Sequence, residues 1–438
     1  MFSITNAPMN WEIIQACGGN ANITLEGKYE KEANGEELIV KAYDEETDEP
    51  ITEWMYVNEN GNDWSISFNL PLGGPYRIEI RKHRNDVWLA RGKCEAMIHH
   101  ICVGDVFVVA GQSNAIGTGH GEMTETAEFG VHVFRDLKFW DIATNPLHFG
   151  RANHGPYLTF AKRLKKSLNY PIGLIPCAYG GSSISDWSKE NNGFLYNEMI
   201  SVINDKSIKG ILWYQGEYEA MNCDSENYFE KFCTFVKNIR QDTNNPNLPI
   251  ITCQLNRHTD DFDNGDEMDI HYTSIREAQR KAFMELDNIS IVPTIDAGRL
   301  SDGIHNSKSA NMLIGERLAR QTLYDIYKKG LNPSAPNVQY IKQICPNKIE
   351  IKFNFVEDTL MAYHVKNAER FPIRVTDSLG KNAIESFEIK KDKIILLLNR
   401  DIKDNVEIDC QFGRNPNNYI QDFGKQIAVL CFRCTLEN

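Results

Sequence analysis

The sequence lacks the usual features of exported, membrane-spanning and nucleic-acid-binding proteins. No basic residue precedes Lys28 and no continuous apolar segment opens the chain, so we expect no secretory signal peptide. No apolar run approaches the about 18 residues that a membrane helix needs. The 47 Lys and Arg residues against 60 Asp and Glu give a net charge of -13, which a phosphate backbone would repel. We therefore expect a cytoplasmic protein, secreted only if a signal stood upstream, without membrane or nucleic-acid partners.

The sequence also lacks a recognisable metal motif. The 11 cysteines are an odd number scattered along the chain, which favours reduced thiols over a disulfide framework. Cys431 and Cys434 form a C-x-x-C pair with no second pair to complete a zinc site. The acidic stretch 260–269 departs from a calcium loop, because Gly265 falls one place early and Tyr272 stands where the closing glutamate belongs. We expect a solvated loop there, and no metal or organic cofactor for the chemistry.

What the sequence does contain is enough apolar material for two or three folded domains. Of 438 residues, 42% are hydrophobic and 24% are charged. Short alternating runs, broken by Asn-Gly and Gly-Gly-Pro turn signals, fill the segment from Asn22 to Cys102, and alternation returns after the proline-containing segment 332–336. We therefore expect β domains at 1–102 and 333–438, on either side of a central domain at 103–332.

The central segment alternates apolar strands with helical patterns. Such branched, fully apolar strands are typical of a parallel sheet covered on both faces by helices. Pro156 is placed as a first helical residue, and Ser274 and Glu277 have the spacing of a capping box for a later helix. The predicted fold class is α/β, a three-layer α/β/α sandwich with a parallel sheet. Its expected strands cover 106–110, 172–178, 210–214, 249–255 and 289–294.

A candidate nucleophile follows the first of these strands. Gly111 permits a tight turn before Ser113, and ligands of such folds bind at the carboxyl ends of the strands. A serine hydroxyl needs a base to take its proton and a third group to orient that base. Asp302 and His305, three residues apart just past the last strand, offer both. Either feature alone is better explained by a turn or a helix cap.

Two further strand ends carry groups that could stabilise an oxyanion. Gly181 follows the second strand and can present a backbone N–H without side-chain obstruction. Gln215, in Trp213-Tyr214-Gln215-Gly216-Glu217, follows the third and can donate from its amide. Because all four segments end successive strands, they are predicted to meet at one edge of the sheet.

The segments GQSN, AYGGSSISDW, WYQGE and DGIH together resemble the SGNH hydrolase superfamily, in the branch of sialate O-acetylesterases and acetylxylan esterases. The similarity extends over roughly residues 60 to 320 and implies a flavodoxin-like SGNH fold. It implies Ser113 as nucleophile, His305 as base and Asp302 as its orienting carboxylate. The implied oxyanion hole is the N–H of Ser113, the N–H of Gly181 and the side chain of Gln215. Glu217 is an alternative or additional partner of His305, or a residue that holds the loop.

The resemblance implies a serine esterase that removes O-acetyl groups from a carbohydrate, with O-acetylated sialic acid favoured. Acetylated xylan or another hemicellulose oligosaccharide is the alternative substrate. A catalytically inactive glycan-binding protein is the competing class, and a lipase is disfavoured because no apolar lid segment is evident. The expected partner is the acetylated sugar, and self-association into a homo-oligomer stays open.

Overall fold

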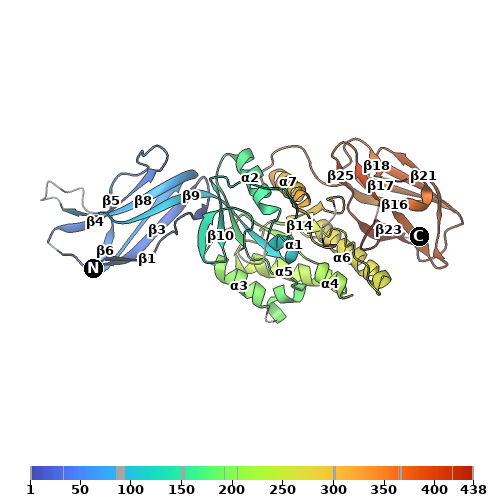
Figure 1. The fold of residues 1–438 in the computed structure, drawn as a ribbon, viewed down its shortest axis with the longest axis horizontal. Coiled ribbons are helices and arrows are strands. Elements are labelled where there is room, and N and C mark those ends of the chain that lie inside the picture. Colours follow the sequence, from blue (N-terminus) through green and yellow to red (C-terminus); the bar gives the residue numbers. More distant parts are fainter. Residues whose placement is uncertain are drawn as a thin grey trace.

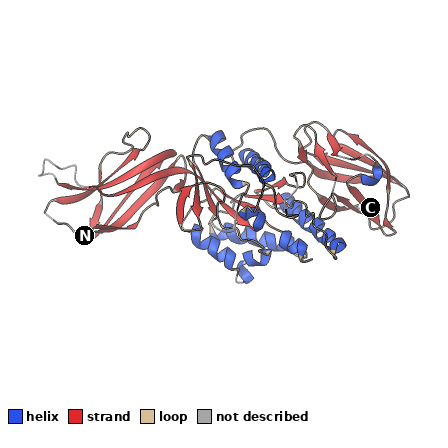
Figure 2. Cartoon of the chain, viewed as in Figure 1, coloured by secondary structure: helices blue, strands red, loops and turns tan. Residues whose placement is uncertain are grey.

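The computed structural model describes residues 2–32, 34–84, 94–148, 153–191, 193–204, 206–298, 302–363, 365, 367–416 and 418–436. Three units follow one another along an elongated molecule (Figure 1), and each has its own cluster of buried apolar side chains. Both outer units consist almost entirely of strands, and the helices are concentrated in the middle unit (Figure 2). The fold is therefore mixed α/β. No helix in the described ranges is long and apolar enough to cross a membrane.

The N-terminal unit packs two sheets against each other. Every second side chain of β3 and β7 is buried, as expected where one face of a sheet meets a core and the other meets water. Ile23 and Ile66 from one sheet and Ile78 from the other share the same cluster. The strands of this unit are β1 (Phe2–Asn6), β2 (Ile13–Gln15), β3 (Asn20–Tyr29), β4 (Glu36–Asp44), β5 (Met55–Tyr56), β6 (Asn58–Asn60), β7 (Asp63–Pro71) and β8 (Gly73–Arg84).

A single long strand, β9 (Cys94–Gly111), joins the N-terminal unit to the middle one. Its first part pairs antiparallel with β8 as far as Val103. From Asp105 onward it pairs parallel with β12, and from Phe107 with β13. The expected boundary between residues 102 and 103 thus falls inside a continuous strand, and the two units share one sheet.

The core of the middle sheet is parallel. The strand order is β11-β10-β12-β9-β13-β14-β15, and every neighbouring pair is parallel except β10 with the edge strand β11. All five strands expected from the sequence are present. Strands β10 and β11 were not predicted. The bounds are β10 (Val131–Arg135), β11 (Phe139–Ile142), β12 (Ile172–Pro176), β13 (Gly210–Tyr214), β14 (Ile250–Gln254) and β15 (Ile289–Pro293).

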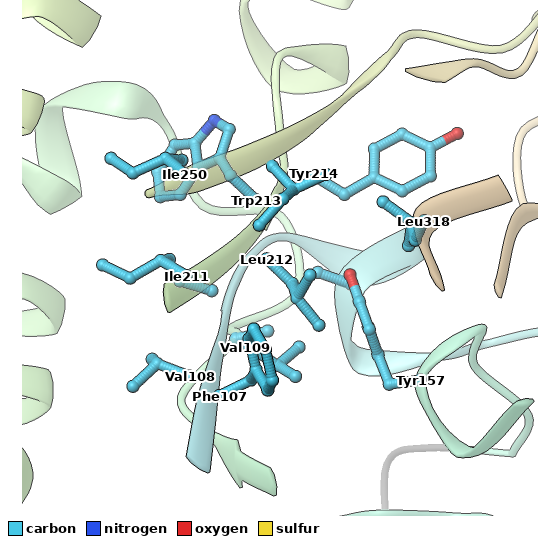
Figure 3. Packing of buried hydrophobic residues seen from close by; sticks show 14 of the residues in the cluster. Phe107, Val108, Val109, Tyr157, Ile211, Leu212, Trp213, Tyr214, Ile250 and Leu318 are labelled. Carbon is cyan, nitrogen blue, oxygen red and sulfur yellow. The ribbon is translucent and has the colours of Figure 1, made fainter. Parts of the chain in front are cut away.

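Helices lie on both sides of this sheet, with α2 and α7 on one side and α3, α5 and α6 on the other (Figure 1). Neighbouring residues along a strand therefore pack against helices on opposite faces of the sheet (Figure 3). Phe107 meets Phe160 of α2 at a ring distance of 5.1 Å, and Trp213 meets Phe235 of α5 at 4.6 Å. The helices are α1 (Ser113–Ile116), α2 (Tyr157–Leu168), η1 (Ile184–Trp187), η2 (Lys189–Asn191), α3 (Phe194–Ile203), α4 (Glu217–Met221), α5 (Tyr228–Asp242), α6 (Gly265–Glu285) and α7 (Lys308–Asp325).

Two predicted helix starts need correction. Ser274 lies in the middle of α6, where its Oγ donates to the carbonyl of Ile270 at 2.9 Å, so it caps nothing. The helix begins at Gly265, and the second half of the acidic stretch 260–269 forms its first turn, where carboxylates interact favourably with the helix dipole. Pro156 precedes α2 as its N-cap, one position before the predicted place.

The C-terminal unit is a β structure that packs against α6 and the end of the middle sheet. Ile291 of β15 shares an apolar cluster with Leu430. Its elements are β16 (Asn337–Cys345), β17 (Lys348–Asn354), β18 (Leu360–Tyr363), η3 (Ala368–Arg370), β19 (Ile373–Asp377), β20 (Gly380–Lys381), β21 (Ile384–Lys390), β22 (Lys393–Leu398), β23 (Glu407–Cys410), β24 (Tyr419–Asp422), β25 (Ile427–Ala428) and β26 (Phe432–Thr435).

Candidate active site

Ser113 stands at the end of β9, on a turn that requires glycine before it. Gly111 has a φ of 126°, and a Cβ added there would lie 2.1 Å from the carbonyl oxygen of Tyr214. The N–H of Gln112 donates to the same oxygen at 2.9 Å. The chain then enters α1 at Ser113. The close approach of β9 and β13 thus fixes the place of the candidate nucleophile.

His305 and Asp302 form a hydrogen-bonded pair. Nδ1 of His305 lies 2.5 Å from Oδ2 of Asp302, and Oδ1 accepts the His305 N–H at 2.9 Å. Partial burial by itself raises the pKa of Asp302, but the hydrogen bonds from His305 outweigh it and hold this pKa below its ordinary value. Asp302 is therefore a carboxylate that orients the ring and leaves Nε2 for another partner.

Asn114, the residue after Ser113, connects the nucleophile segment to the histidine segment. Its Oδ1 accepts the N–H of Asn306 at 3.0 Å, and its Nδ2 lies 3.4 Å from the carbonyl oxygen of Ile304. The peptide groups on both sides of His305 are thus bound to the side chain next to Ser113. The structure brings these two predicted site residues to the same edge of the sheet.

Glu217 is a buried hydrogen-bond partner of Asn114. Its side chain is 3% exposed, and Oε1 accepts a hydrogen bond from Asn114 Nδ2 at 2.8 Å. Burial raises the pKa of Glu217, and the bond from Asn114 acts in the opposite direction. No hydrogen bond joins Glu217 to His305 within the described part of the chain. Of the two carboxyl groups considered from the sequence, Asp302 contacts the imidazole and Glu217 holds Asn114.

Gly181 lies in an exposed loop that follows β12. It has a φ of 69°, and no atom lies within 4 Å of where a Cβ would be. Its loop is tied to the end of β9, because the N–H of Tyr179 donates to the Gly111 carbonyl at 2.9 Å. Ser182 is held in turn by Trp187, whose Nε1 donates to the serine Oγ at 3.1 Å. Gly181 thus belongs to an exposed loop that is anchored to the strand before Ser113, and its role as an oxyanion donor stays a prediction.

The structure differs from the sequence analysis at Gln215. Its Nε2 donates to the Ser182 carbonyl at 3.1 Å and to the Glu219 carboxylate at 2.6 Å, and its Oε1 accepts from Tyr228 at 3.0 Å. The side chain is fully buried. Both amide hydrogens are therefore used in hydrogen bonds within the protein, and none is left to donate to an oxyanion. Gln215 instead connects the loop 180–182, which contains Gly181, to the end of β13.

Ser113 lines a cavity of about 580 Å³. Ile116 and Leu137 give it an apolar wall, while Asp136 and His148 give it polar groups. Burial lowers the pKa of His148, which keeps the ring neutral near pH 7. Asp136 and His148 were not identified from the sequence, because they flank the unpredicted strands β10 and β11. Larger cavities among the described residues, of about 610, 770 and 800 Å³, do not include Ser113.

The chain matches the profile of a family described as carbohydrate esterase, sialic acid-specific acetylesterase, over residues 103–324. This is about half of the 438 residues. The matched segment runs from the second half of β9 into α7. It includes all of the predicted site residues, Ser113, Gly181, Gln215, Glu217, Asp302 and His305.

Individual proteins resemble parts or all of the chain. A probable carbohydrate esterase of Arabidopsis thaliana is 30% identical over 249 residues, which cover 50% of this chain and 90% of that protein. Human sialate O-acetylesterase is 23% identical over 234 residues, so this chain matches 44% of its length. The solved structure of a carbohydrate acetylesterase from Xanthomonas citri has a TM-score of 0.73 at 19% identity and covers 99% of both chains. That likeness concerns the fold, and it includes both flanking β units.

Proposed function

Because this chain belongs to the family of sialic acid-specific acetylesterases among the carbohydrate esterases, we propose that Ser113, His305 and Asp302 hydrolyse an O-acetyl ester of sialic acid. The observation that carries the proposal is the double hydrogen bond of Asn114 to the peptides around His305. It ties the loop of an imidazole, already oriented by a carboxylate, to the residue that follows a serine at a strand end, which supports the pairing of the two. A serine, a base and an orienting acid in this order form the machinery of acyl transfer.

In the first step, Ser113 Oγ attacks the acetyl carbonyl carbon while Nε2 of His305 takes the hydroxyl proton. Asp302 holds the neutral ring in the tautomer that leaves Nε2 free, and it then stabilises the imidazolium that forms. The negative charge on the carbonyl oxygen is stabilised by the backbone N–H groups of Ser113 and Gly181. The C–O bond to the sugar then breaks, and His305 returns the proton to the leaving hydroxyl.

In the second step, water attacks the acetyl-serine. His305 takes one proton from the water, and the tetrahedral intermediate collapses as the bond to Ser113 Oγ breaks. The proton goes back to Ser113 and acetate leaves. The leaving sugar hydroxyl receives the proton of Ser113, and the attacking water replaces that proton, so the two steps return the enzyme to its starting state.

The cavity beside Ser113 supports a sugar ester over a long-chain lipid ester. Asp136 lies 3.9 Å from Nδ1 of His148, and Nε2 of His148 is buried with no hydrogen-bond partner among the described residues. An unpaired buried nitrogen is costly, and a substrate hydroxyl would satisfy it. A polar wall of this kind would instead penalise an alkyl chain. The family description favours sialic acid over other acetylated sugars.

The proposal is tested by acetate release from O-acetylated sialic acids, with acetylated xylo-oligosaccharides and p-nitrophenyl butyrate as competing substrates. Ser113→Ala should lower kcat by at least about 10³-fold. Ser201→Ala, at an exposed serine on α3, is the matched control and should retain full activity. Equal activity in wild type and Ser113→Ala would overturn the mechanism. Faster hydrolysis of xylo-oligosaccharides than of sialic acids would keep the mechanism and overturn the proposed sugar.

A further inference from the structure

A second group of reactive side chains lies away from Ser113, between the end of α4 and the start of α6. The Cys223 sulfur, a carboxylate oxygen of Glu267 and a ring nitrogen of His271 all lie within 4.8 Å of one another. Glu267 and His271 are four residues apart on α6, so they project from the same face of the helix. Cys223 comes from the loop that follows α4, and α4 lies beside α6 (Figure 1).

Neighbouring polar groups hold these side chains in place. Oγ of Ser225 lies 2.7 Å from Nδ1 of His271, which fixes the orientation of the ring. Nδ2 of Asn264 lies 3.6 Å from the Cys223 sulfur and donates to it. Outer partners of this kind are typical of metal ligands, because they orient the ligand and tune its basicity. Two of the three ligands thus have a supporting contact.

The same group is poorly suited to act as a nucleophile. A reactive cysteine has a lowered pKa and a base against its sulfur. Burial raises the pKa of Cys223, and the nearby Glu267 carboxylate raises it further. A thiol facing a carboxylate is, however, a natural ligand pair for a divalent cation, since the cation removes the repulsion between thiolate and carboxylate.

We propose that Cys223, Glu267 and His271 bind one Zn²⁺ ion between α4 and α6. Sulfur, carboxylate oxygen and imidazole nitrogen are the donor atoms that zinc takes in proteins. Three protein ligands leave one tetrahedral position for water, because the group lies at the surface, where Glu267 is exposed. The ion plays no part in the acetyl transfer. Its role is to fasten the loop after α4 to α6.

Helix α4 links the proposed zinc site to the candidate esterase site. Glu217 is the first residue of α4, and Cys223 follows its last residue, Met221, by two positions. A ligand that binds the folded chain more tightly than the unfolded chain raises the free energy of unfolding by mass action. Zn²⁺ is therefore expected to raise the Tm of the protein while leaving Ser113 chemistry intact.

The test uses the full chain, freed of metal with EDTA and dialysed. Co²⁺ should bind with one equivalent and give a thiolate-to-cobalt charge-transfer band, and Zn²⁺ should displace it and protect Cys223 from iodoacetamide. Cys223→Ser and His271→Ala should each abolish the band and weaken Zn²⁺ binding. Ser225→Ala should weaken it by about 10- to 100-fold, as loss of an outer partner does. Cys345→Ser, at an exposed cysteine of the C-terminal unit, is the control.

Three outcomes would overturn the proposal. They are the absence of a charge-transfer band in wild type, an unchanged band in Cys223→Ser, and equal alkylation of Cys223 with and without Zn²⁺. Acetylesterase activity of each variant is measured alongside and shows that it is folded. A folded Cys223→Ser or His271→Ala variant that retains the cobalt band counts against the site, and one that loses it while Cys345→Ser retains it supports the site.

Discussion

The Glu217 carboxylate accepts a hydrogen bond from Asn114 at 2.8 Å, and the same Asn114 side chain binds the peptides before and after His305. A buried acid therefore acts on the candidate base through one intervening amide and the backbone. Asp302 acts on it directly, at 2.5 Å. The two carboxyl groups near the site thus have separable tasks, orientation of the ring and placement of its loop.

Replacing the two acids by their amides should separate these tasks. Asp302→Asn removes the charge that favours the imidazolium and should lower kcat by up to about 10⁴-fold. Glu217→Gln keeps an oxygen for Asn114 and should cost less than about 10-fold. Steady-state acetate release measures both, with Tm as the check on folding. A larger loss of kcat in Glu217→Gln than in Asp302→Asn would assign the orienting role to Glu217.

Truncation of Asn114 should release the loop that carries His305. Asn114→Ala removes its hydrogen bonds to Asn306 and Ile304, and a displacement of the base by about 1 Å can cost about 100-fold in kcat. KM should change little if Asn114 does not touch the sugar. Asn222→Ala, which loses a bond to the Tyr218 carbonyl on the exposed end of α4, is the control. Unchanged kcat in Asn114→Ala would show that the loop holds its position without this side chain.

A single methyl group at Gly111 should prevent normal folding of the sheet. In Gly111→Ala the Cβ meets the Tyr214 carbonyl at 2.1 Å, and the φ of 126° is itself strained for alanine. We expect a loss of more than about 3 kcal/mol in the free energy of unfolding. Gly330→Ala has a φ of 87° and no atom within 4 Å, so it should lose only about 1 kcal/mol. Urea denaturation compares the two, and equal losses would contradict the clash.

Glu219 should make stability depend on pH. Burial raises its pKa from 4.5 to about 6, against hydrogen bonds from Ile184 and Gln215. The folded state therefore holds a proton that the unfolded state releases. The resulting stability is fully present below pH 4.5 and is lost as the pH rises through about 6. Between these values the Tm of wild type should fall more than that of Glu219→Gln. Parallel curves for the two proteins would contradict this linkage.

Arg276 should contribute strongly to the contact between the middle and C-terminal units. Its fully buried guanidinium donates to the carbonyls of Leu255, Asn256 and Gly413 at 2.9, 2.7 and 2.5 Å. Arg276→Met leaves these oxygens unpaired and should cost about 2 to 4 kcal/mol. Arg320→Met, at an exposed arginine of α7, should be neutral. Equal Tm values for the two variants would show that the carbonyls find other partners.

The sequence was most informative where the pattern is local. The strand at 210–214 was predicted at its observed bounds, because a fully apolar run is what a strand covered on both faces requires. The contact between Asp302 and His305 was also predicted, because the two residues are only three positions apart and can meet within one turn of the chain. Neither inference depends on distant parts of the chain.

Contacts between distant segments could not be predicted in this way. Arg276 of α6 is fully buried, and the Gly413 carbonyl to which it donates is 137 residues away in the sequence. The hydrogen bonds that the Gln215 amide donates to Ser182 and Glu219 were not predicted. A side-chain amide at this position could donate to an oxyanion or to a neighbouring loop, and the sequence does not distinguish the two. The position of α4 beside the loop 180–182 determines that Gln215 binds this loop and Glu219.

The continuity of β9 limits how this protein can be divided or recombined. A shortened chain that begins at residue 103 keeps the sequence matched by the family but cuts the strand between its two pairing regions. It would leave Ile14 and Gln15 of β2 without their partners Val103 and Gly104 in one fragment, and a frayed end ten residues before Ser113 in the other. Exchange of the N-terminal unit between related enzymes would therefore succeed best at a junction before β9, so that the whole strand is inherited with the nucleophile.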